Sequence, residues 1–256
     1  MSSLKIYFAY QQFDVSILGS MDKVNVKNLS VFFPAYNEEE NIRVMVEKAL
    51  LVLKTLKLND YEVMVVNDGS TDGTAKVVEG LAKRDRHVRL INRTQNGGYG
   101  EALKCGLYGA RFENIVYTDS DLQFDFSEVT KFLEKSEKAD IVVGFRINRS
   151  DPPVRIIIGW VWTMLANALL GVGVKDVDCG FKLVKKKVIE TIPKLESSRG
   201  GMISPELLAK AKKYGFKIIE VGVYHHPRQA GRQTGADLQV MIRSFADLLK
   251  LWWQLR

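Results

Sequence analysis

The feature that most constrains the fold is an alternation of two patterns along the chain. Short runs rich in β-branched and aromatic residues end at polar or glycine-rich positions, and segments with apolar residues at helical spacing separate them. The apolar runs fall near residues 29–35, 61–67, 88–92, 114–118 and 139–145. This alternation favours an α/β fold with a mixed, mostly parallel sheet flanked by helices. In such sheets ligands bind beyond the carboxyl ends of the strands, so functional residues are expected there.

The length of 256 residues fits one large domain with a sizeable core. We expect residues 1–28 to form an arm of unknown role, residues 29–235 to form the α/β domain, and residues 236–256 to form a C-terminal helix. At the start of the first helix of the domain, Asn37 is expected to be the N-cap and Glu40 its capping partner.

A long apolar stretch runs from Ile156 to Val174 and approaches the length of a membrane span. Candidate site residues lie on both sides of this stretch, and a span would place them on opposite faces of a membrane. We therefore expect a buried or interfacial helix rather than a span.

Charge and cysteine usage limit the partners and the compartment. The net charge of +7 favours anionic partners, and the chain lacks an RNA-reading aromatic signature, zinc-finger spacing and a basic zipper. Phosphate groups or a membrane surface are thus expected rather than nucleic acid. Cys105 and Cys179 show no CxxC spacing, and no long apolar segment of a secretory signal lies near residue 1, which favours a cytoplasmic setting.

Asp119, Asp121 and Gln123 follow the apolar run Ile115–Tyr117. In an extended chain their spacing of two places all three side chains on one face. Carboxylate and amide oxygens suit hard divalent cations, and such a cation neutralises charge developing on a diphosphate leaving group. Many DxD pairs are solvated turn residues, so this pair predicts a metal site only in a supporting context.

Three further segments supply that context. They are FFPAYNEEE at 32–40, VVNDGSTDGT at 65–74, and the glycine-rich stretch with Gly97, Gly98 and Gly100. The first two run from a strand into a helix, and in the third backbone N–H groups are expected to approach a phosphate. Each segment alone also fits an ordinary turn.

Together and in this order, the segments resemble the family 2 glycosyltransferases of the GT-A fold, which is Rossmann-like. The resemblance is strongest to the dolichol-phosphate mannosyltransferase branch and covers about residues 29–235. It implies a GDP- or UDP-linked sugar donor, Mg²⁺ or Mn²⁺ as cofactor, and inversion at the anomeric centre. The implied donor-binding residues are Pro34, Tyr36, Glu38, Val66, Asp68 and Ser120. The implied residues for the metal and diphosphate are Asp119, Asp121 and Gln123.

Two positions depart from the family pattern. The family often has consecutive aspartates where this chain has Asn67 and Asp68, and a lysine where it has Thr234. Arg232 is a candidate replacement for that lysine, and the resemblance implies that Arg228 contacts the donor diphosphate.

The arginines bear on the acceptor. A guanidinium group donates two parallel hydrogen bonds to a phosphate, and the resemblance implies that Arg146 and Arg155 bind the phosphate of a polyprenyl lipid, dolichyl or undecaprenyl. A phosphate oxygen is already ionised at neutral pH, so such an acceptor needs no general base. Asp178 is the candidate base if the acceptor is instead a glycan hydroxyl. A third alternative is a non-catalytic scaffold that binds nucleotide-sugars, which the intact Asp119 and Asp121 disfavour.

The C-terminal segment carries an amphipathic pattern. Its apolar stripe comprises Leu238, Met241, Ile242, Phe245, Leu248, Leu249 and Trp252. Such a helix docks on a membrane surface, packs on its own domain, or packs on a second copy of the chain. Because a lipid acceptor stays in the bilayer, we expect a peripheral membrane enzyme, and a homo-oligomer remains an alternative.

Overall fold

The computed structural model describes residues 25–198, 200–228 and 238–255. Within these residues the strands are β1 Asn28–Ala35, β2 Asp60–Asp68, β3 Val88–Arg93, β4 Asn114–Tyr117, β5 Ile141–Ile147, β6 Lys182–Lys185 and β7 Ile218–Tyr224. The helices are α2 Glu39–Thr55, α3 Thr74–Ala82, α4 Tyr99–Gly109, α5 Val129–Ser136, α6 Pro153–Leu170, α7 Lys186–Thr191, α8 Gly200–Lys213 and α9 Leu238–Leu255, with a short 3-10 helix η2 at Phe126–Glu128. The expected arm at residues 1–28 falls almost wholly outside the described residues.

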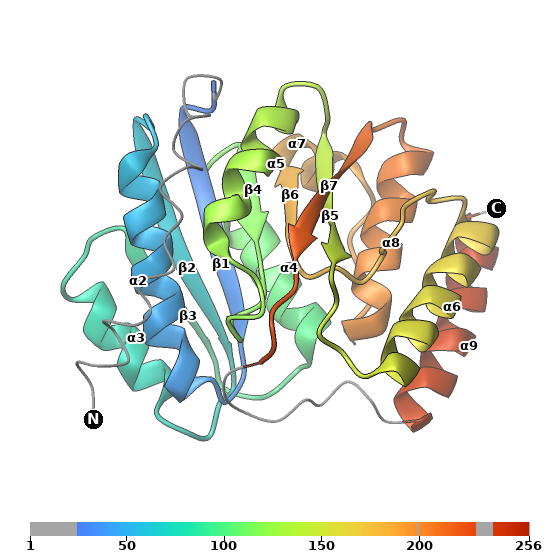
Figure 1. Ribbon diagram of the computed structural model, residues 1–256, viewed down its shortest axis with the longest axis horizontal. Coiled ribbons are helices and arrows are strands. Elements are labelled where there is room, and N and C mark those ends of the chain that lie inside the picture. Colours follow the sequence, from blue (N-terminus) through green and yellow to red (C-terminus); the bar gives the residue numbers. More distant parts are fainter. Residues whose placement is uncertain (1–24, 199, 229–237, 256) are drawn as a thin grey trace.

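The strands form one sheet in the order β3-β2-β1-β4-β6-β5-β7. The pairs β1 with β2, β1 with β4, β2 with β3, and β5 with β7 are parallel, whereas β6 is antiparallel to both of its neighbours. In Figure 1 the arrow of β6 accordingly points opposite to those of β4, β5 and β7. The mixed, mostly parallel sheet expected from the sequence is confirmed, and all five expected strands are present.

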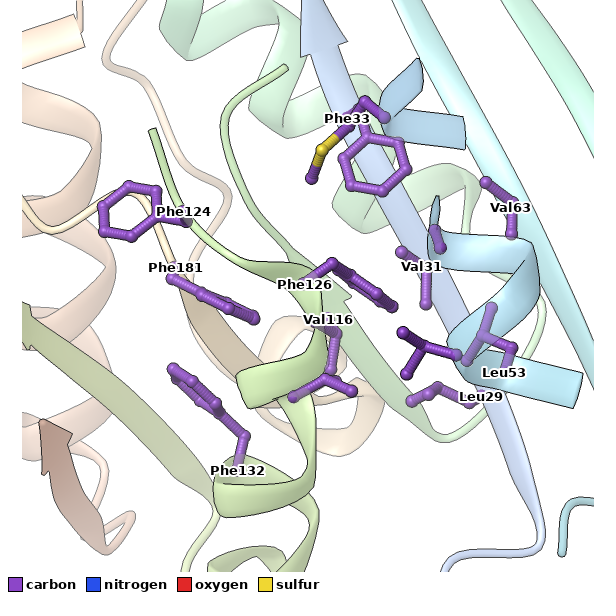
Figure 2. Packing of buried hydrophobic residues seen from close by; sticks show 14 of the residues in the cluster. Leu29, Val31, Phe33, Leu53, Val63, Val116, Phe124, Phe126, Phe132 and Phe181 are labelled. Carbon is purple, nitrogen blue, oxygen red and sulfur yellow. The ribbon is translucent and has the colours of Figure 1, made fainter. Parts of the chain in front are cut away.

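Each face of the sheet has its own apolar core. Leu29, Val31 and Phe33 of β1 point into a core shared with α2 and α5, and Phe32 points into the opposite core, shared with α4 and α8. Figure 2 shows the first core, in which Phe132 and Phe181 stack with ring centroids 4.3 Å apart. This alternation of faces along β1 is the two-residue period of a strand buried on both sides.

Helix α6 differs from a core helix. It ends at Gly171, which has a φ of 64°, and only Thr163 and Ala166 of its residues are buried. The alternative of a buried helix is therefore wrong. By length and composition this helix is apolar enough to cross a membrane. It contacts α9, and Figure 1 shows the two side by side at the end of the molecule away from α2 and α3.

Candidate active site

The loops that follow β1 and β2 are held together by Asn37. This residue has a φ of 55°, its Oδ1 accepts a hydrogen bond from the N–H of Thr71 at 2.8 Å, and its own N–H donates to Ser70 Oγ at 2.9 Å. The expected capping of the first helix by Asn37 and Glu40 is therefore wrong. Glu38 occupies the N-cap position instead and makes no side-chain capping bond. The side chain of Asn37 turns towards the second loop.

Asp68 organises the glycine-rich loop after β3. Its carboxylate accepts hydrogen bonds from the N–H groups of Gly97 at 3.1 Å and Gly98 at 2.8 Å, and Arg93 lies 3.3 Å away. The two amides expected to approach a phosphate are thus directed at Asp68. Gly69 has a φ of 68°, and a Cβ there would lie 2.6 Å from the backbone of the same loop, so only glycine fits.

The segment after β4 is a turn rather than an extended strand. β4 ends at Tyr117, and Leu122 has a φ of 62°, which breaks the alternation expected for Asp119, Asp121 and Gln123. The prediction that the three side chains share one face of an extended chain is therefore wrong. The turn nevertheless lies at the carboxyl end of β4 and beside that of β1, where the strand order reverses.

Asp119 is fixed by two contacts. Its Oδ1 accepts a hydrogen bond from Tyr99 Oη at 2.6 Å. Its Oδ2 lies 2.2 Å from the position that a Cβ on Gly180 would take, so the chain before β6 approaches this carboxylate as closely as glycine allows. Asp119 therefore sits where the first half of the sheet meets the segment 176–181.

Asp121 and Glu38 are brought together by Arg228. The Arg228 guanidinium forms an ion pair with Glu38 and places Nη1 3.4 Å from Asp121 Oδ2. Burial, and then the charge of Asp119, raise the pKa of Asp121 to about 7. Burial also raises the pKa of Glu38, against the opposing effects of Asn41 and Arg228. Two carboxylates that share a buried position attract cations.

The remaining residues expected to bind the donor range from fully buried to exposed. Pro34 donates no hydrogen bond, but its carbonyl oxygen accepts one from Ser120 Oγ at 2.9 Å, which ties the ends of β1 and β4 together. The ring of Tyr36 is exposed at the surface. Val66 is fully buried, so its side chain supports the site from the core. Arg232 lies outside the described residues.

The oxygen atoms gathered here suit a hard divalent cation. Asp119, Asp121 and the side chain of Gln123 offer oxygen ligands only, and Gln123 Nε2 donates to the carbonyl oxygen of His226 at 3.2 Å. Among the described residues, no three His, Cys, Asp or Glu side chains gather at metal-binding distances. Mg²⁺ is commonly held by one or two carboxylates together with substrate phosphates, so two aspartates beside a diphosphate are a sufficient protein contribution.

On the other half of the sheet, Arg146 is held by Asp176. Arg146 Nε lies 2.6 Å from Asp176 Oδ2, and Nη2 lies 2.8 Å from Oδ1. Burial alone would raise the pKa of Asp176, but the hydrogen bonds and charge of Arg146 outweigh it and lower that pKa. Asp176 was not expected from the sequence, because its partner lies thirty residues away along the chain.

A second carboxylate lies close to three arginines. Asp151, in the loop between β5 and α6, accepts hydrogen bonds from Arg149, and both Arg146 and Arg155 reach it within 4 Å. Arg149 and Asp151 were also not assigned from the sequence. Their clustering between Arg146 and Arg155, within ten residues, is the signal that would have found them.

Asp178 lies between the two halves. Burial, and then the charge of Asp176, raise its pKa to about 6, while Arg146 and Lys182 oppose that rise. Lys182 is fully buried beneath the site, where it donates to the Cys179 carbonyl and lies 3.1 Å from Ser204 Oγ. Burial lowers the pKa of Lys182. A carboxyl group with this pKa has the properties of a general base, although it also offsets the charge of the buried lysine.

Comparison with known proteins places this site in a family. Residues 30–192 match the model of "Glycosyl transferase family 2". A dolichyl-phosphate beta-glucosyltransferase of Dictyostelium discoideum is 32% identical over 93% of this chain and 80% of its own length. A dolichyl-phosphate beta-glucosyltransferase of Trichomonas vaginalis is 31% identical over 87% of this chain and 72% of its own length. An undecaprenyl-phosphate 4-deoxy-4-formamido-L-arabinose transferase of Pectobacterium atrosepticum is 27% identical over 88% of this chain and 67% of its own length.

Solved structures agree on the fold. Glucosyl-3-phosphoglycerate synthase from Mycobacterium tuberculosis, in complex with Mn²⁺, uridine diphosphate and phosphoglyceric acid, superposes with a TM-score of 0.71 at 20% identity, over 92% of this chain and 82% of that one. The same enzyme has also been solved with Mg²⁺ and uridine diphosphate, with a TM-score of 0.69. The GT-A-like fold expected from the sequence is confirmed, and the chain belongs to glycosyl transferase family 2 as a glycosyltransferase of the polyprenyl-phosphate branch.

Proposed function

We propose that this enzyme transfers a sugar from a nucleotide-sugar to a polyprenyl phosphate at a membrane surface. One observation carries the proposal: the paired carboxylates Asp119 and Asp121 follow β4, and Arg146 at the end of β5 and Arg155 in the first turn of the exposed apolar helix α6 lie at the same edge of the sheet. The relatives named above as dolichyl-phosphate and undecaprenyl-phosphate transferases support the acceptor class.

The donor side would bind the nucleoside diphosphate. In this proposal Pro34, Tyr36 and Glu38 face the nucleoside with Asp68 and Ser120 beside them, and Arg228 and Arg232 contact the diphosphate. Asp119, Asp121 and Gln123 would hold Mg²⁺ or Mn²⁺, which supplies positive charge to the departing diphosphate. The named relatives that are glucosyltransferases, and the uridine diphosphate in the solved neighbours, make UDP-glucose the first donor to test.

The transfer itself exchanges one bond for another. An ionised oxygen of the lipid phosphate attacks the anomeric carbon, the bond from that carbon to the diphosphate oxygen breaks, and its electron pair leaves with the nucleoside diphosphate. No proton has to be removed from the nucleophile, so no base is required. Attack from the side opposite the diphosphate inverts the anomeric centre. Arg146 and Arg155 would orient the attacking phosphate through their planar guanidinium groups.

A glycan hydroxyl is the alternative acceptor, and one observation favours it: Asp178 lies beside the site with a pKa raised to about 6 by burial and by Asp176. A base with that pKa accepts a proton from a hydroxyl at neutral pH. The two acceptors are distinguishable because only the hydroxyl requires Asp178.

The apolar surface of α6 and α9 supports a membrane location. Val154, Ile157, Ile158, Trp160, Val161 and Met164 of α6 and Phe245, Leu249 and Trp253 of α9 are exposed; we call these nine residues the apolar surface. The expected stripe of α9 divides, because Leu248 is buried against the domain while Phe245 and Leu249 remain exposed. Large apolar side chains that are exposed together are typical of a membrane or protein contact.

The direct test combines the purified enzyme, UDP-glucose, Mn²⁺ and vesicles that contain dolichyl phosphate. We expect glucose-linked lipid and stoichiometric release of uridine diphosphate, neither of which forms when the metal is chelated. Parallel reactions with GDP-mannose and with a soluble oligosaccharide define the donor and the acceptor. Product on the oligosaccharide alone would contradict the proposed acceptor.

A further inference from the structure

The loop between β5 and α6 places one carboxylate at the centre of a basic cluster. Asp151 Oδ2 accepts hydrogen bonds from Arg149 Nη2 at 2.9 Å and Nε at 3.1 Å. Arg155 Nε lies 3.5 Å from Asp151 Oδ1, and Arg146 Nη1 and His225 Nδ1 each lie 3.9 Å from Oδ2. Four side chains from two separate segments of the chain thus surround a single carboxylate.

Asp151 and Asp176 hold the arginines in different ways. Asp176 binds Arg146 through two guanidinium bonds and the backbone N–H at 3.2 Å, and so fixes this arginine in place. Asp151 instead lies at the point where three guanidinium groups converge, and its side chain is only 2% exposed. Asp176 has the geometry of an anchor, and Asp151 has the position of a bound anion.

The imidazole of His225 is the fourth side chain beside Asp151, with Nδ1 3.9 Å from Oδ2. His225 is 6% exposed, and its Nδ1 has no hydrogen-bond partner among the described residues. Its ring packs edge-on against Phe124, and Ser150 Oγ donates to its carbonyl oxygen at 2.9 Å. A buried nitrogen without a partner lowers stability, so this one marks a position where a further polar group is accommodated.

We infer that the carboxylate of Asp151 occupies the position of the acceptor phosphate, that the phosphate displaces it on binding, and that Arg149 and His225 then contact the phosphate together with Arg146 and Arg155. Carboxylates and phosphates accept the same forked pair of hydrogen bonds from a guanidinium group. The inference rests on the proposed function in taking a phosphate as the acceptor group.

The charges of the cluster agree with displacement. Three arginines face the two carboxylates of Asp151 and Asp176, and the nearby Asp178 and Lys182 offset each other. A phosphate monoester carries a charge of about −1.5 to −2 at neutral pH. If it replaces Asp151 the cluster becomes nearly neutral, whereas if Asp151 stays the buried cluster gains net negative charge.

Displacement would also discriminate between two sources of phosphate. A built-in carboxylate weakens the binding of every anion that competes for the arginines. The reason is that Asp151 has left the arginines in only a fraction of the molecules, and only that fraction can bind an anion. A lipid phosphate overcomes this penalty when the enzyme is docked on the bilayer, where the effective concentration of the headgroup is high. Free phosphate in solution has no such advantage. Asp151 would raise the Kd of both sources by the same factor, so that the concentrated lipid headgroup still fills the site while dilute free phosphate does not.

The test is the variant Asp151→Asn, which keeps the shape of the side chain and removes its charge. Inorganic phosphate binding is measured by calorimetry on the whole chain without donor, so no turnover is needed. We expect about tenfold tighter phosphate binding, as follows from removing an occupant present in most molecules. We also expect a lower KM for dolichyl phosphate and stronger inhibition of transfer by inorganic phosphate.

Two companion variants make the result specific. Arg149→Gln should weaken phosphate binding several-fold, since it removes a donor from the site. Asp140→Asn removes a carboxylate at the other end of β5, where Asp140 pairs with Lys187 at 2.7 Å, and should change nothing. Weaker phosphate binding in Asp151→Asn would overturn the inference, because it would make Asp151 an anchor like Asp176.

If the variant does not fold, the inference is tested by a measurement on the unmodified protein. Hydrogen exchange of the amides of residues 148–151 should become faster when inorganic phosphate binds, because the displaced loop loses the contacts of Asp151. Slower exchange there would contradict displacement. If phosphate behaves as expected while sugar transfer goes only to a hydroxyl, the proposed function fails, and the displacement of Asp151 by phosphate stands without phosphate being the acceptor.

Discussion

The two halves of the strand-end region both contain ion pairs, such as Arg228 with Glu38 on the donor half and Arg146 with Asp176 on the acceptor half, but they differ in the contacts that order their loops. On the donor half, carboxylate and amide side chains bind backbone N–H groups, as Asp68 does at Gly97 and Gly98 and Asn37 does at Thr71. On the acceptor half, arginines are held by carboxylates, as in the pair of Arg146 with Asp176. Backbone contacts fix one geometry, whereas ion pairs can exchange one anion for another. Under the proposed function, the donor half would hold a constant ligand and the acceptor half an anion that exchanges.

The largest effect is expected on the donor half, at Asp121. Asp121→Asn should lower metal-dependent turnover by about a thousandfold, since it removes the charge of a proposed metal ligand and with it the stabilisation of the leaving group. Stability should hold, because the substitution removes a buried like charge beside Asp119. Turnover and Mn²⁺ affinity are measured together, with Glu79→Gln on the surface of α3 as the control. Unchanged metal dependence in Asp121→Asn would remove the proposed metal site.

The variant Arg146→Lys tests whether the donor half and the acceptor half bind their ligands independently. Lysine keeps the charge but loses the planar fork, so the KM for dolichyl phosphate should rise about 10- to 100-fold while the KM for the donor stays constant. Lysine is preferable to alanine here because alanine would leave buried Asp176 without its partner, at a cost of about 3–5 kcal/mol. An equal rise in both KM values would show that the halves are not independent.

Removing exposed apolar side chains should weaken membrane binding without touching either half. The double variant Ile157→Ser, Trp160→Ser removes two side chains of the apolar surface that are 61% and 63% exposed. We expect several-fold less sedimentation with anionic liposomes, because less apolar area enters the bilayer. Leu51→Ser, exposed on α2 at the other end of the sheet, is the matched control. Equal sedimentation of the two variants would show that a surface other than the apolar surface docks on the membrane.

The smallest effect is expected from Asp178→Asn, and it depends on pH. The folded pKa of Asp178, about 6, lies above its unfolded value near 3.9, so ionisation disfavours the folded state increasingly as the pH rises to 6 and fully above it. Asparagine never ionises. The variant should therefore gain on the order of 1 kcal/mol more stability at pH 8 than at pH 5, relative to the unsubstituted chain. Thermal unfolding at both pH values measures this.

The same variant also tests the acceptor. Transfer to a lipid phosphate should persist in Asp178→Asn, since no base is needed. Loss of transfer with intact donor binding would instead identify Asp178 as the base for a hydroxyl.

The sequence predicted the features that depend on local pattern. Buried β-branched runs located the first five strands, and the order of three motifs located the strand ends that carry Asp68 and Asp119. It did not predict the turn at Leu122, because a positive φ at a leucine is fixed by packing: Leu122, Phe124 and Phe126 are all buried. Nor did it predict the partner of Arg146, since Asp176 comes from a distant segment that only the folded sheet brings close.

The exposed face of α6 changes how the enzyme would meet its acceptor. The helix begins two residues after Asp151, so a molecule resting on its apolar face holds the basic cluster at the height of the lipid headgroups. The enzyme then meets its acceptor by diffusion in two dimensions, because enzyme and lipid both move laterally along one leaflet of the membrane. Reaction rates should follow the mole fraction of polyprenyl phosphate in the bilayer rather than its concentration in the whole sample, and dilution with inert phospholipid should slow the enzyme at constant total acceptor.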